Sequence, residues 1–486
     1  MSGKRIAAIV LTLALSGGLF AACSINPATG KRQLTLIGES DEVQLGLEND
    51  KAIVASMGLY DDDELQSYVQ QLGRRLASRS ERPSLDWTFR VIDDPIVNAF
   101  ALPGGYIYVT RGILAHFNSE AELAAVLGHE IGHVTARHGV NQMSKATLAQ
   151  LGLGVGMIVS EDVQKYGGLL QATTSLVFLK FSRDDERQAD DLGLRYLVRG
   201  EFDPRPMPNV YTMLQRVSQA SGGSGPPGWM STHPAPENRE QRMQASIAAL
   251  NQDFSGRAVN RESYIQRLDG VVFGNNPRDG YFEDGRFNHP ELRFRVDFPP
   301  GWKTSNQRAA VSAVSPNEDA LVQLTLVSQA TPGEALNAFF AEQQSLQRGQ
   351  AWRDRIGGFP CSSQYFSVAA TEQQQGMRGL VAFVQYDGKV FGMVGVAAEN
   401  AWSSHEAGVA DTLGSFARLT DTVALAAEPM RIKVVEATRP RSLADFGSGN
   451  GSKVPLATLA LINGLPENGR VEAGKSYKIV TGGRLP

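Results

Sequence analysis

Residues 129–133, His-Glu-Ile-Gly-His, are the most informative stretch of this 486-residue chain. In an α-helix, residues i and i+4 lie on one face, so the imidazoles of His129 and His133 can reach the same metal ion. Glu130 is turned by about 100° from His129 and can address a water at that ion. A metal lowers the pKa of such a water and a carboxylate takes its proton, which gives hydroxide near neutral pH. The motif therefore predicts a zinc hydrolase site.

The sequence around the motif predicts that it lies on a helix. Ser119 and Glu122 have the spacing of a capping box, in which each side chain accepts a hydrogen bond from the backbone near the other residue. Apolar residues then recur with helical spacing through the motif, at Leu123, Val126, Leu127, Ile131 and Val134. A helix that carries two surface histidines is the alternative interpretation.

A tetrahedral zinc ion bound by two histidines needs a third protein ligand and an open position for water. Residue 139, where a metzincin has its third histidine, is a glycine. His138 is expected to be a solvated residue of the last helical turn, stabilised by the helix dipole. Residues 182–190 open a second helix, in which Glu186 is the predicted third ligand. Asp190, one turn later, is predicted to accept the free ring N–H of a ligating histidine. A solvated charged helix face is the alternative.

Four runs resemble the zinc metalloproteases that include HtpX and the CAAX prenyl endopeptidases (peptidase family M48), particularly their periplasmic lipoprotein members. They are residues 129–133, 182–190, 98–110, and 231–234 with Arg239 beyond, within roughly residues 24–250. The family commonly has a second glutamate at the position of Gln188. The resemblance implies a gluzincin endopeptidase with one zinc ion per chain, held by His129, His133 and Glu186.

The run at 98–110 predicts how a substrate is held. Residues 98–102 and 106–110 are rich in strand-forming residues and flank a Pro-Gly-Gly turn, which predicts a β-hairpin before the metal helix. An exposed edge of that hairpin could bind a peptide as an added strand, with Asn98 and Phe100 in contact with the substrate. An ordinary hairpin that covers the core is the alternative.

His233 follows a loop rich in glycine and proline at residues 222–228. Its place in a family-like run implies an oxyanion stabiliser, or a mobile group that occupies the open zinc position. A structural or solvated loop histidine is the alternative. Arg239 is expected to form a surface salt bridge, although it could also position His233.

The N-terminal sequence predicts export and a lipid anchor. Basic residues 4–5 precede an apolar run at 6–22, as in the n-region and h-region of a signal peptide. Residues 20–23, Phe-Ala-Ala-Cys, resemble a bacterial lipobox, so Cys23 is predicted to be the lipidated first residue of the mature protein. Ser24 is not the aspartate that accompanies inner-membrane retention, which favours the outer membrane. An uncleaved membrane anchor and a soluble secreted protein are the alternatives.

The composition agrees with a soluble exported protein. Hydrophobic residues make up 42% of the chain, the net charge is −4, and no later run of some twenty apolar residues follows; we expect no nucleic-acid partner. Cys361 is the only other cysteine, so no intrachain disulfide is expected unless Cys23 stays unmodified, and Cys361 is predicted to be a buried, inert thiol. The short apolar segment 146–159 predicts a core helix or a flap over the cleft.

The length predicts roughly three folded units and a multidomain α+β fold. A tether at 23–40 precedes a mainly α-helical gluzincin protease domain with a small β-sheet at 41–272. Helical patterns at 42–57 and 64–78 open this domain. After a linker, residues 284–424 alternate strands with a helix. The predicted strands are 292–298, 320–327, 364–368, 379–386 and 389–397, and the predicted helix is 333–346. This unit faintly resembles antiparallel α+β domains of the PsbP type. Residues 430–486 resemble a small βααβ LysM module. Residues 439–441 replace its usual Gly-Asp-Thr, so glycan binding and a purely packing role both stay open.

The predicted function is that of a zinc-dependent endopeptidase of the bacterial cell envelope. It hydrolyses misfolded or misassembled envelope proteins, with Glu130 activating the water. The alternative is a non-proteolytic envelope assembly or peptidoglycan-binding lipoprotein with a latent metal site. Peptidoglycan hydrolysis carries less weight, because the motif resembles endopeptidases that act on extended protein chains. Glu130 favours proteolysis, since a binding protein has no physical need for that carboxylate.

Overall fold

The computed structural model describes residues 23–150, 180–220, 229, 233, 238–342, 345–370 and 375–484. The chain divides into two compact units. Unit 1 consists of Met1–Gly274 and Arg431–Thr481, and unit 2 of Asn275–Met430 and Gly482–Pro486. The predicted signal peptide and the greater part of the apolar segment 146–159 lie outside the described residues. In the described part of the chain, no helix has the length and apolarity to cross a membrane.

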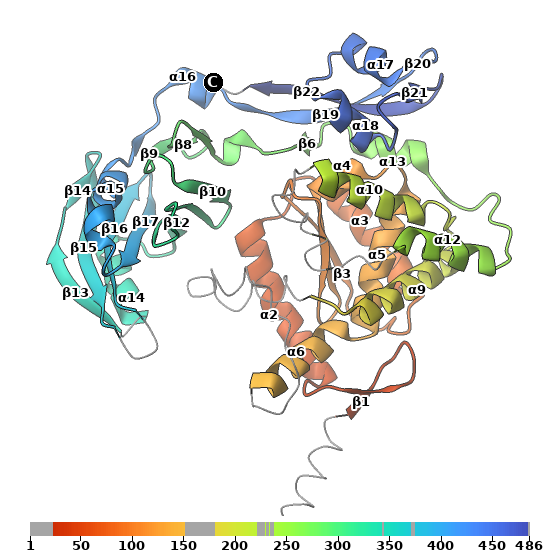
Figure 1. The fold of residues 1–486 in the computed structure, drawn as a ribbon, viewed down its shortest axis with the longest axis horizontal. Coiled ribbons are helices and arrows are strands. Elements are labelled where there is room, and N and C mark those ends of the chain that lie inside the picture. Colours follow the sequence, from red (N-terminus) through yellow and green to blue (C-terminus); the bar gives the residue numbers. More distant parts are fainter. Residues whose placement is uncertain are drawn as a thin grey trace, which may run out of the picture. The chain divides into compact units, whose positions relative to one another are not determined.

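Unit 1 is mainly helical, which confirms the predicted helical protease region of a multidomain α+β chain (Figure 1). Before residue 274, its described helices are α2 (Glu39–Met57), α3 (Asp63–Ala77), α4 (Arg111–His116), α5 (Glu120–Thr135), α6 (His138–Gln150), α9 (Arg183–Arg199), α10 (Met207–Ala220), α12 (Arg239–Ala249) and α13 (Arg261–Arg267). Helix α5, which carries the metal motif, is buried on all sides from Ala121 to Thr135. A helix that is buried on all sides is held in place by close packing and can hold ligands rigidly.

A small mixed sheet lies in unit 1 beside α5. Strand β3 (Thr88–Ile92) runs parallel to β5 (Tyr106–Thr110), and β4 (Ala99–Leu102) pairs with β5 in antiparallel register. The predicted hairpin is therefore present, and Gly104 and Gly105 make its turn with φ of 82° and 100°. The strand order is β3-β5-β4, so the second edge of β4 has no partner among the described strands.

The N-terminal residues of unit 1 form a short hairpin before α2. Strands β1 (Cys23–Ile25) and β2 (Arg32–Leu34) pair with each other, and α2 begins five residues after β2. The start of α2 at Glu39 is three residues earlier than the sequence pattern predicts, because apolar periodicity does not report the polar first turn of a helix.

The C-terminal segment packs as part of unit 1. Its elements are β19 (Glu428–Glu436), β20 (Arg441–Ser442), α17 (Leu443–Gly449), α18 (Leu456–Ile462), β21 (Arg470–Val471) and β22 (Ser476–Arg484). Strands β22, β19 and β6 (Val272–Phe273) form a three-stranded sheet in that order. The side chain of Lys478, on β22, is fully buried. Its Nζ donates to the carbonyls of Ala115 at 2.9 Å and Phe117 at 2.6 Å, immediately before α5. The segment has two short strands, β20 and β21, in addition to the predicted βααβ elements. The LysM resemblance and the proposed domain boundaries stay predictions.

Unit 2 is built on antiparallel strands. They are β7 (Tyr281–Glu283), β8 (Arg286–His289), β9 (Phe294–Asp297), β10 (Lys303–Gln307), β11 (Ala310–Val314), β12 (Ala320–Val327), β13 (Leu346–Ala351), β14 (Arg355–Ile356), β15 (Phe359–Val368), β16 (Met377–Tyr386), β17 (Lys389–Ala398) and β18 (Ala417–Arg418). The main sheet has the order β10-β11-β12-β17-β16-β15-β13. The helices are η1 (Pro277–Asp279), α14 (Pro332–Glu342), α15 (Trp402–Gly414) and α16 (Thr422–Leu425).

The five strands predicted in unit 2 are present, but the predicted helix at 333–346 extends too far. The described part of α14 ends at Glu342, and Leu346 already pairs with Val368 in the sheet. Pairing with a neighbouring strand outweighs the local helix pattern there. Cys361 is buried in this unit, as predicted, and burial raises the pKa of its thiol to about 11.

Candidate metal centre

Four side chains from three segments of unit 1 converge on one point. They are His129, His133, Glu186 and His233, and one ligand atom of each lies within 4.8 Å of all the others. All four are buried. The first two come from α5, Glu186 from the first turn of α9, and His233 from the segment between α10 and α12. The structure thus brings together the three ligands predicted from the sequence and the predicted loop histidine.

The helices α5 and α9 approach closely because glycines lie at their contact. A Cβ atom at Gly132 would stand 3.0 Å from the carbonyl oxygen of Ala189, and one at Gly193 would stand 3.0 Å from the backbone nitrogen of His129. Side chains at these two positions would push the helices apart. This close packing places the first turn of α9, and with it Glu186, against the face of α5 that carries both histidines.

The start of α5 differs in one detail from the predicted capping box. Ser119 Oγ accepts from the backbone N–H of Glu122 at 3.2 Å, as expected of an N-cap. The Glu122 carboxylate, however, accepts from the N–H of Asn118 at 2.6 Å rather than from Ser119. The Ser119 half of the prediction is right and the Glu122 half is wrong, because the chain before the cap presents the Asn118 N–H to this carboxylate.

The distances between the ligand atoms fit a single metal ion. His129 Nε2 lies 3.0 Å from His133 Nε2 and 3.5 Å from Glu186 Oε2, and His133 Nε2 lies 3.4 Å from Glu186 Oε1. Ligands at about 2.0–2.1 Å from a tetrahedral zinc ion stand roughly 3.3 Å apart. Two ring nitrogens and a carboxylate at this spacing, facing one another in a buried site, match the donor set of a catalytic zinc centre.

Asp190 fixes the orientation of His129. Its Oδ1 lies 3.0 Å from His129 Nδ1 and accepts a hydrogen bond from Tyr211 at 2.9 Å. Arg239 donates to both carboxylate oxygens, at 2.8 and 2.5 Å. Burial alone would raise the pKa of Asp190, but the Arg239 charge and the hydrogen bonds hold it below its usual range. The ionised carboxylate accepts the Nδ1–H of His129, which leaves Nε2 free to face the cluster.

The same network shifts the pKa of His129. Burial lowers the pKa of this histidine, but its hydrogen bonds to Asp190 and Glu186 outweigh burial and raise the pKa to about 9.

Arg239 is buried at the site. The expectation that it forms a surface salt bridge is wrong, since its side chain is only 7% exposed. Helix α12 returns to the site and places the guanidinium over the rings of Tyr211, at 4.6 Å, and Trp229, at 5.5 Å.

His138 pairs with the Nδ1 atom of His133, as Asp190 pairs with that of His129. Its Nδ1 lies 2.9 Å from His133 Nδ1, and its Nε2 lies 2.9 Å from Gln188 Oε1. The expectation of a solvated histidine is wrong, because Arg137 adopts a left-handed conformation (φ 59°) that turns the chain and buries His138. Burial lowers the pKa of His138, so the ring is neutral. With its proton on Nε2 and directed at Gln188, it accepts from His133 Nδ1 and leaves His133 Nε2 for the metal.

Glu130 is fully buried beside the cluster. Among the described residues, none donates a hydrogen bond to either of its carboxylate oxygens, and His233 Nε2 lies 3.6 Å from Oε1. Burial raises the pKa of Glu130 above its ordinary value. A buried carboxylate without hydrogen-bond donors is costly for folding, so a structural role does not account for it. Its position and raised pKa suit a group that takes up and releases a proton.

His233 and three aromatic residues complete the wall of the site. His233 Nδ1 lies 2.8 Å from Glu186 Oε1 and 3.4 Å from His129 Nε2, and its backbone N–H donates to Trp229 at 2.8 Å. The ring of Phe181 lies 4.1 Å from that of His133. The sequence analysis did not identify Trp229, Phe181 or Tyr211. The spacing of four between Trp229 and His233 was the one available signal.

The two predicted substrate contacts are placed differently from each other. Phe100 is 3% exposed and stacks on Tyr108 at 4.8 Å, so its side chain packs in the core. Asn98, just before β4, is also buried, and its Oδ1 has no hydrogen-bond partner among the described residues. The ring of Phe100 is thus part of the core, and the contacts of both residues with a substrate stay predictions.

Comparison with known proteins gives matches for the helical part of unit 1. Residues 63–247 match the model of Peptidase family M48. The chain is 37% identical over 191 residues to the mitochondrial metalloendopeptidase OMA1 of Arabidopsis thaliana, which covers 38% of this chain and 37% of that protein. It is 30% identical over 244 residues to the beta-barrel assembly-enhancing protease of Escherichia coli, covering 47% of this chain and 50% of the relative. The chain thus spans half or less of the length of these two relatives.

A partial likeness to a solved structure was also found. The solution structure of cyanobacterial PsbP (CyanoP) from Synechocystis sp. PCC 6803 covers 27% of this chain and 91% of its own length, at 15% identity and a TM-score of 0.23.

Proposed function

We propose that this chain, whose residues 63–247 are a metalloendopeptidase domain of Peptidase family M48, is a zinc-dependent endopeptidase of the bacterial cell envelope that hydrolyses misfolded or misassembled proteins. The name of the Escherichia coli relative, a beta-barrel assembly-enhancing protease, supports protein substrates in the envelope. The narrower likeness to HtpX and the CAAX prenyl endopeptidases stays a prediction.

His129, His133 and Glu186 would hold one zinc ion per chain. Zinc supplies a Lewis acid for the scissile carbonyl and lowers the pKa of a water. Asp190 and His138 each pair with the Nδ1 of one ligating histidine, so both Nε2 atoms face the cluster. These partners fix the two rings before any substrate arrives.

Glu130 carries the proposal. It is fully buried, and no described residue donates a hydrogen bond to its oxygens. One of these oxygens takes the proton of the attacking water and then delivers it to the nitrogen of the leaving amine. A latent metal site that only binds partners needs the ligands but not this carboxylate, which favours proteolysis over the non-proteolytic alternative.

His233 would occupy the fourth place in the resting enzyme. Its Nδ1 lies among the ligand atoms, 2.8 Å from Glu186 Oε1, as a group that fills the open position would. Substrate binding would then require His233 to move. If it stays near the reacting carbonyl, it can donate to the oxyanion, which is the other role open to it.

The substrate would bind as an extended strand along β4. The edge of β4 that has no partner among the described strands offers backbone N–H and C=O groups, and α5 packs beside this strand. Backbone pairing reads an extended conformation rather than a sequence, which suits unfolded or unassembled protein segments. We propose that Asn98 Oδ1 and the backbone at Phe100 make the polar contacts.

We also propose the envelope location from the sequence. Cleavage after residue 22 would leave Cys23 lipidated and hold the protein at the outer membrane. Mass spectrometry of the mature N-terminus tests this, since an unmodified start at any other residue would contradict it. Peptidoglycan is a further proposed partner, through the C-terminal βααβ segment.

Digestion of casein by the purified native chain and by Glu130→Gln tests the proposed activity. General base catalysis contributes roughly 10²–10⁴-fold to the rate. Glu130→Gln should therefore digest casein at least about 10²-fold more slowly while it keeps its zinc. Glu64→Gln, an exposed glutamate on α3, is the matched control and should stay active. Digestion by Glu130→Gln at the native rate would overturn the proposal.

A further inference from the structure

The N-terminal residues of the described chain are fastened to the end of the metal helix. The side chain of Asn26 is buried and donates to the carbonyl of Ala136 at 3.2 Å, just after α5. Arg137 donates to the carbonyl of Ile37 at 2.9 Å. The backbone N–H of Leu36 donates to Ser144 Oγ, on α6, at 2.9 Å. The hairpin and the segment after it are thus part of the peptidase unit.

Buried charges fasten α2 at the same place. Glu42 is fully buried, and its two carboxylate oxygens accept from Arg82 and Arg137, each at 2.8 Å. Arg82 also donates to the carbonyl of Val134 on α5, at 3.2 Å. Breaking a buried pair of this kind is strongly destabilising, so α2 is held firmly to the end of α5.

This fastening leaves almost no tether. Only Ser24 and Ile25 separate Cys23 from the buried Asn26, so three residues span about 10 Å at most. Two interpretations of the N-terminal sequence bind the chain to a membrane: a lipidated Cys23 and an uncleaved membrane anchor. Both place a membrane-embedded group directly before Ser24. If the apolar run 6–22 is removed, that group is a lipid on Cys23; if the run is kept, it is the run itself.

Exposed apolar side chains gather in the same segment. Among the described residues, seven large hydrophobic side chains are exposed, and four of them lie between residues 25 and 47. Ile25 is 63% exposed, Leu36 45%, Val43 38% and Leu47 39%. Val43 and Leu47 are one helical turn apart and share a face of α2. Single exposed apolar residues are ordinary, but a local concentration indicates a contact surface.

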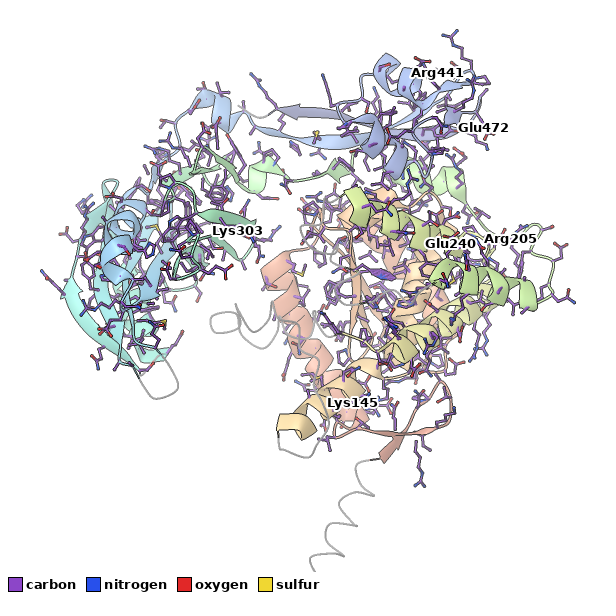
Figure 2. All side chains as sticks on the ribbon, viewed as in Figure 1. Lys145, Arg205, Glu240, Lys303, Arg441 and Glu472 are labelled. Atoms are coloured by element: carbon purple, nitrogen blue, oxygen red, sulfur yellow. The ribbon has the colours of Figure 1, made fainter. Side chains whose placement is uncertain are left out.

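Basic side chains accompany this apolar group. Lys31 and Arg32 are exposed on the β1–β2 hairpin. Figure 2 shows Lys145 on α6, and Figure 1 shows β1, α2 and α6 at the same end of unit 1. Apolar residues that enter the acyl boundary, with basic residues beside them for the headgroups, are the composition of an interfacial membrane contact.

We propose that a lipid bilayer covers this face, which we call the N-terminal face and define by the β1–β2 hairpin, Leu36 and the Val43–Leu47 side of α2. The peptidase unit is then held rigidly at the membrane surface. The residue just after the metal helix, Ala136, accepts a hydrogen bond from Asn26 in the anchored segment. The active site can therefore reach only protein segments close to the bilayer. The membrane contact is independent of the proposed activity, whereas the restricted reach rests on it.

Spin labels test the membrane contact directly. The full chain, with Cys23 kept and Cys361→Ser, is labelled through Leu36→Cys or Leu47→Cys and bound to vesicles of phosphatidylethanolamine and phosphatidylglycerol. Leu326→Cys in unit 2, 55% exposed, is the matched control. We expect labels at Leu36 and Leu47 to collide with oxygen and be shielded from an aqueous nickel complex, unlike the control. Aqueous accessibility at both positions, or shielding from both reagents by another part of the chain, would overturn the proposal.

A linker insertion tests the restricted reach. A flexible Gly/Ser insertion of about 20 residues between Ser24 and Ile25 extends the tether by roughly 25 Å. Casein is coupled to the same vesicles either directly at the headgroup or through a long polyethylene glycol spacer. The native chain should cleave the directly coupled form several-fold faster, and the insertion should reduce this preference. Equal rates from the native chain would overturn the restricted reach. Cleavage of neither form, nor of free casein, would instead refute the proposed activity and leave the spin-label result standing.

Discussion

The two compact units differ in what they bury. In the described part of unit 1, ionisable side chains are buried at twelve positions: Glu42, Asp50, Arg82, Arg111, Glu122, Glu130, Arg137, Glu186, Asp190, Asp203, Arg239 and Lys478. In the described part of unit 2, the buried polar residues are all uncharged: Asn288, Ser315, Ser363 and Thr412. Burying a charge is costly unless it is paired. In unit 1 these buried groups lie at the metal centre and at contacts between segments that are distant in sequence. Unit 2 is stabilised by apolar packing instead.

The largest effect of this contrast is expected at Arg239. Its guanidinium is paired with Asp190, and the two side chains are 7% and 1% exposed. Arg239→Met leaves the Asp190 carboxylate buried and without that partner, which should cost about 3–5 kcal/mol of unfolding free energy. Chemical denaturation of unit 1, followed by the loss of helical circular dichroism, measures it.

Arg242→Met is the matched control for Arg239. It lies three residues later on α12 and pairs with Asp191, but these side chains are 28% and 59% exposed. An exposed pair is worth about 0–1 kcal/mol, so this variant should unfold almost as the native chain does. Equal losses in the two variants would break the contrast between buried and exposed charge.

The corresponding weak point of unit 2 is expected to be an aromatic residue. Phe416 is fully buried, stacks on Phe294 at 5.2 Å and contacts the ring of Phe391 at 5.4 Å. Phe416→Ala should cost about 3–5 kcal/mol through lost burial and the cavity that it leaves. Unfolding of unit 2, followed by near-ultraviolet circular dichroism, tests this, and a loss below about 1 kcal/mol would show that the unit does not depend on its aromatic core.

His233→Ala should change proteolysis with zinc retained. If His233 fills the fourth position, its removal raises basal digestion of casein. If it stabilises the oxyanion, the loss of one such donor lowers kcat by roughly 10²-fold or more. His405→Ala, in unit 2, is the control. Unchanged kinetics on casein and on a short peptide would make His233 a structural loop residue.

The smallest expected effect is a pH dependence at Lys478. Burial lowers the pKa of this amine from 10.5 to about 7, and the nearby Glu122 charge offsets this only in part. Between these values the unfolded chain binds a proton that the folded chain lacks, so the free energy of unfolding should rise with pH from about 7 upward. A full proton corresponds to about 1.4 kcal/mol per pH unit.

The measurement compares the native chain with Lys478→Met between pH 7 and 9. The difference in unfolding free energy between the two should depend on pH, and the exposed Lys475→Met should show no such dependence. A difference that stays constant over this range would mean that Lys478 keeps its proton when buried.

The sequence predicted best where a single periodicity governs. The metal motif lies on one helix, and Glu186 and Asp190 lie one turn apart on another. Each could be predicted from the spacing within a single helix. Strands β12, β16 and β17 of unit 2 alternate or are continuously apolar, and they were predicted within a few residues. Such patterns record which face of an element is buried, and burial determines the element.

The rest depends on contacts that no local pattern contains. His138 and Arg239 read as polar surface residues, and only the turn at Arg137 and the return of α12 bury them. The docking of Lys478 against the residues before α5 joins positions more than 360 apart in sequence. Strand β10 is exposed throughout and shows no alternation, so its sequence gave no signal.

The most direct test of the account is the position of the metal. Crystals of the native chain measured on both sides of the zinc absorption edge should show an anomalous peak between His129 Nε2, His133 Nε2 and Glu186. Elemental analysis should give one zinc per chain, removable by a chelator. Loss of that zinc in His129→Ala with His133→Ala would agree with the account. Undiminished zinc in this double variant, or an anomalous peak elsewhere in the chain, would contradict it.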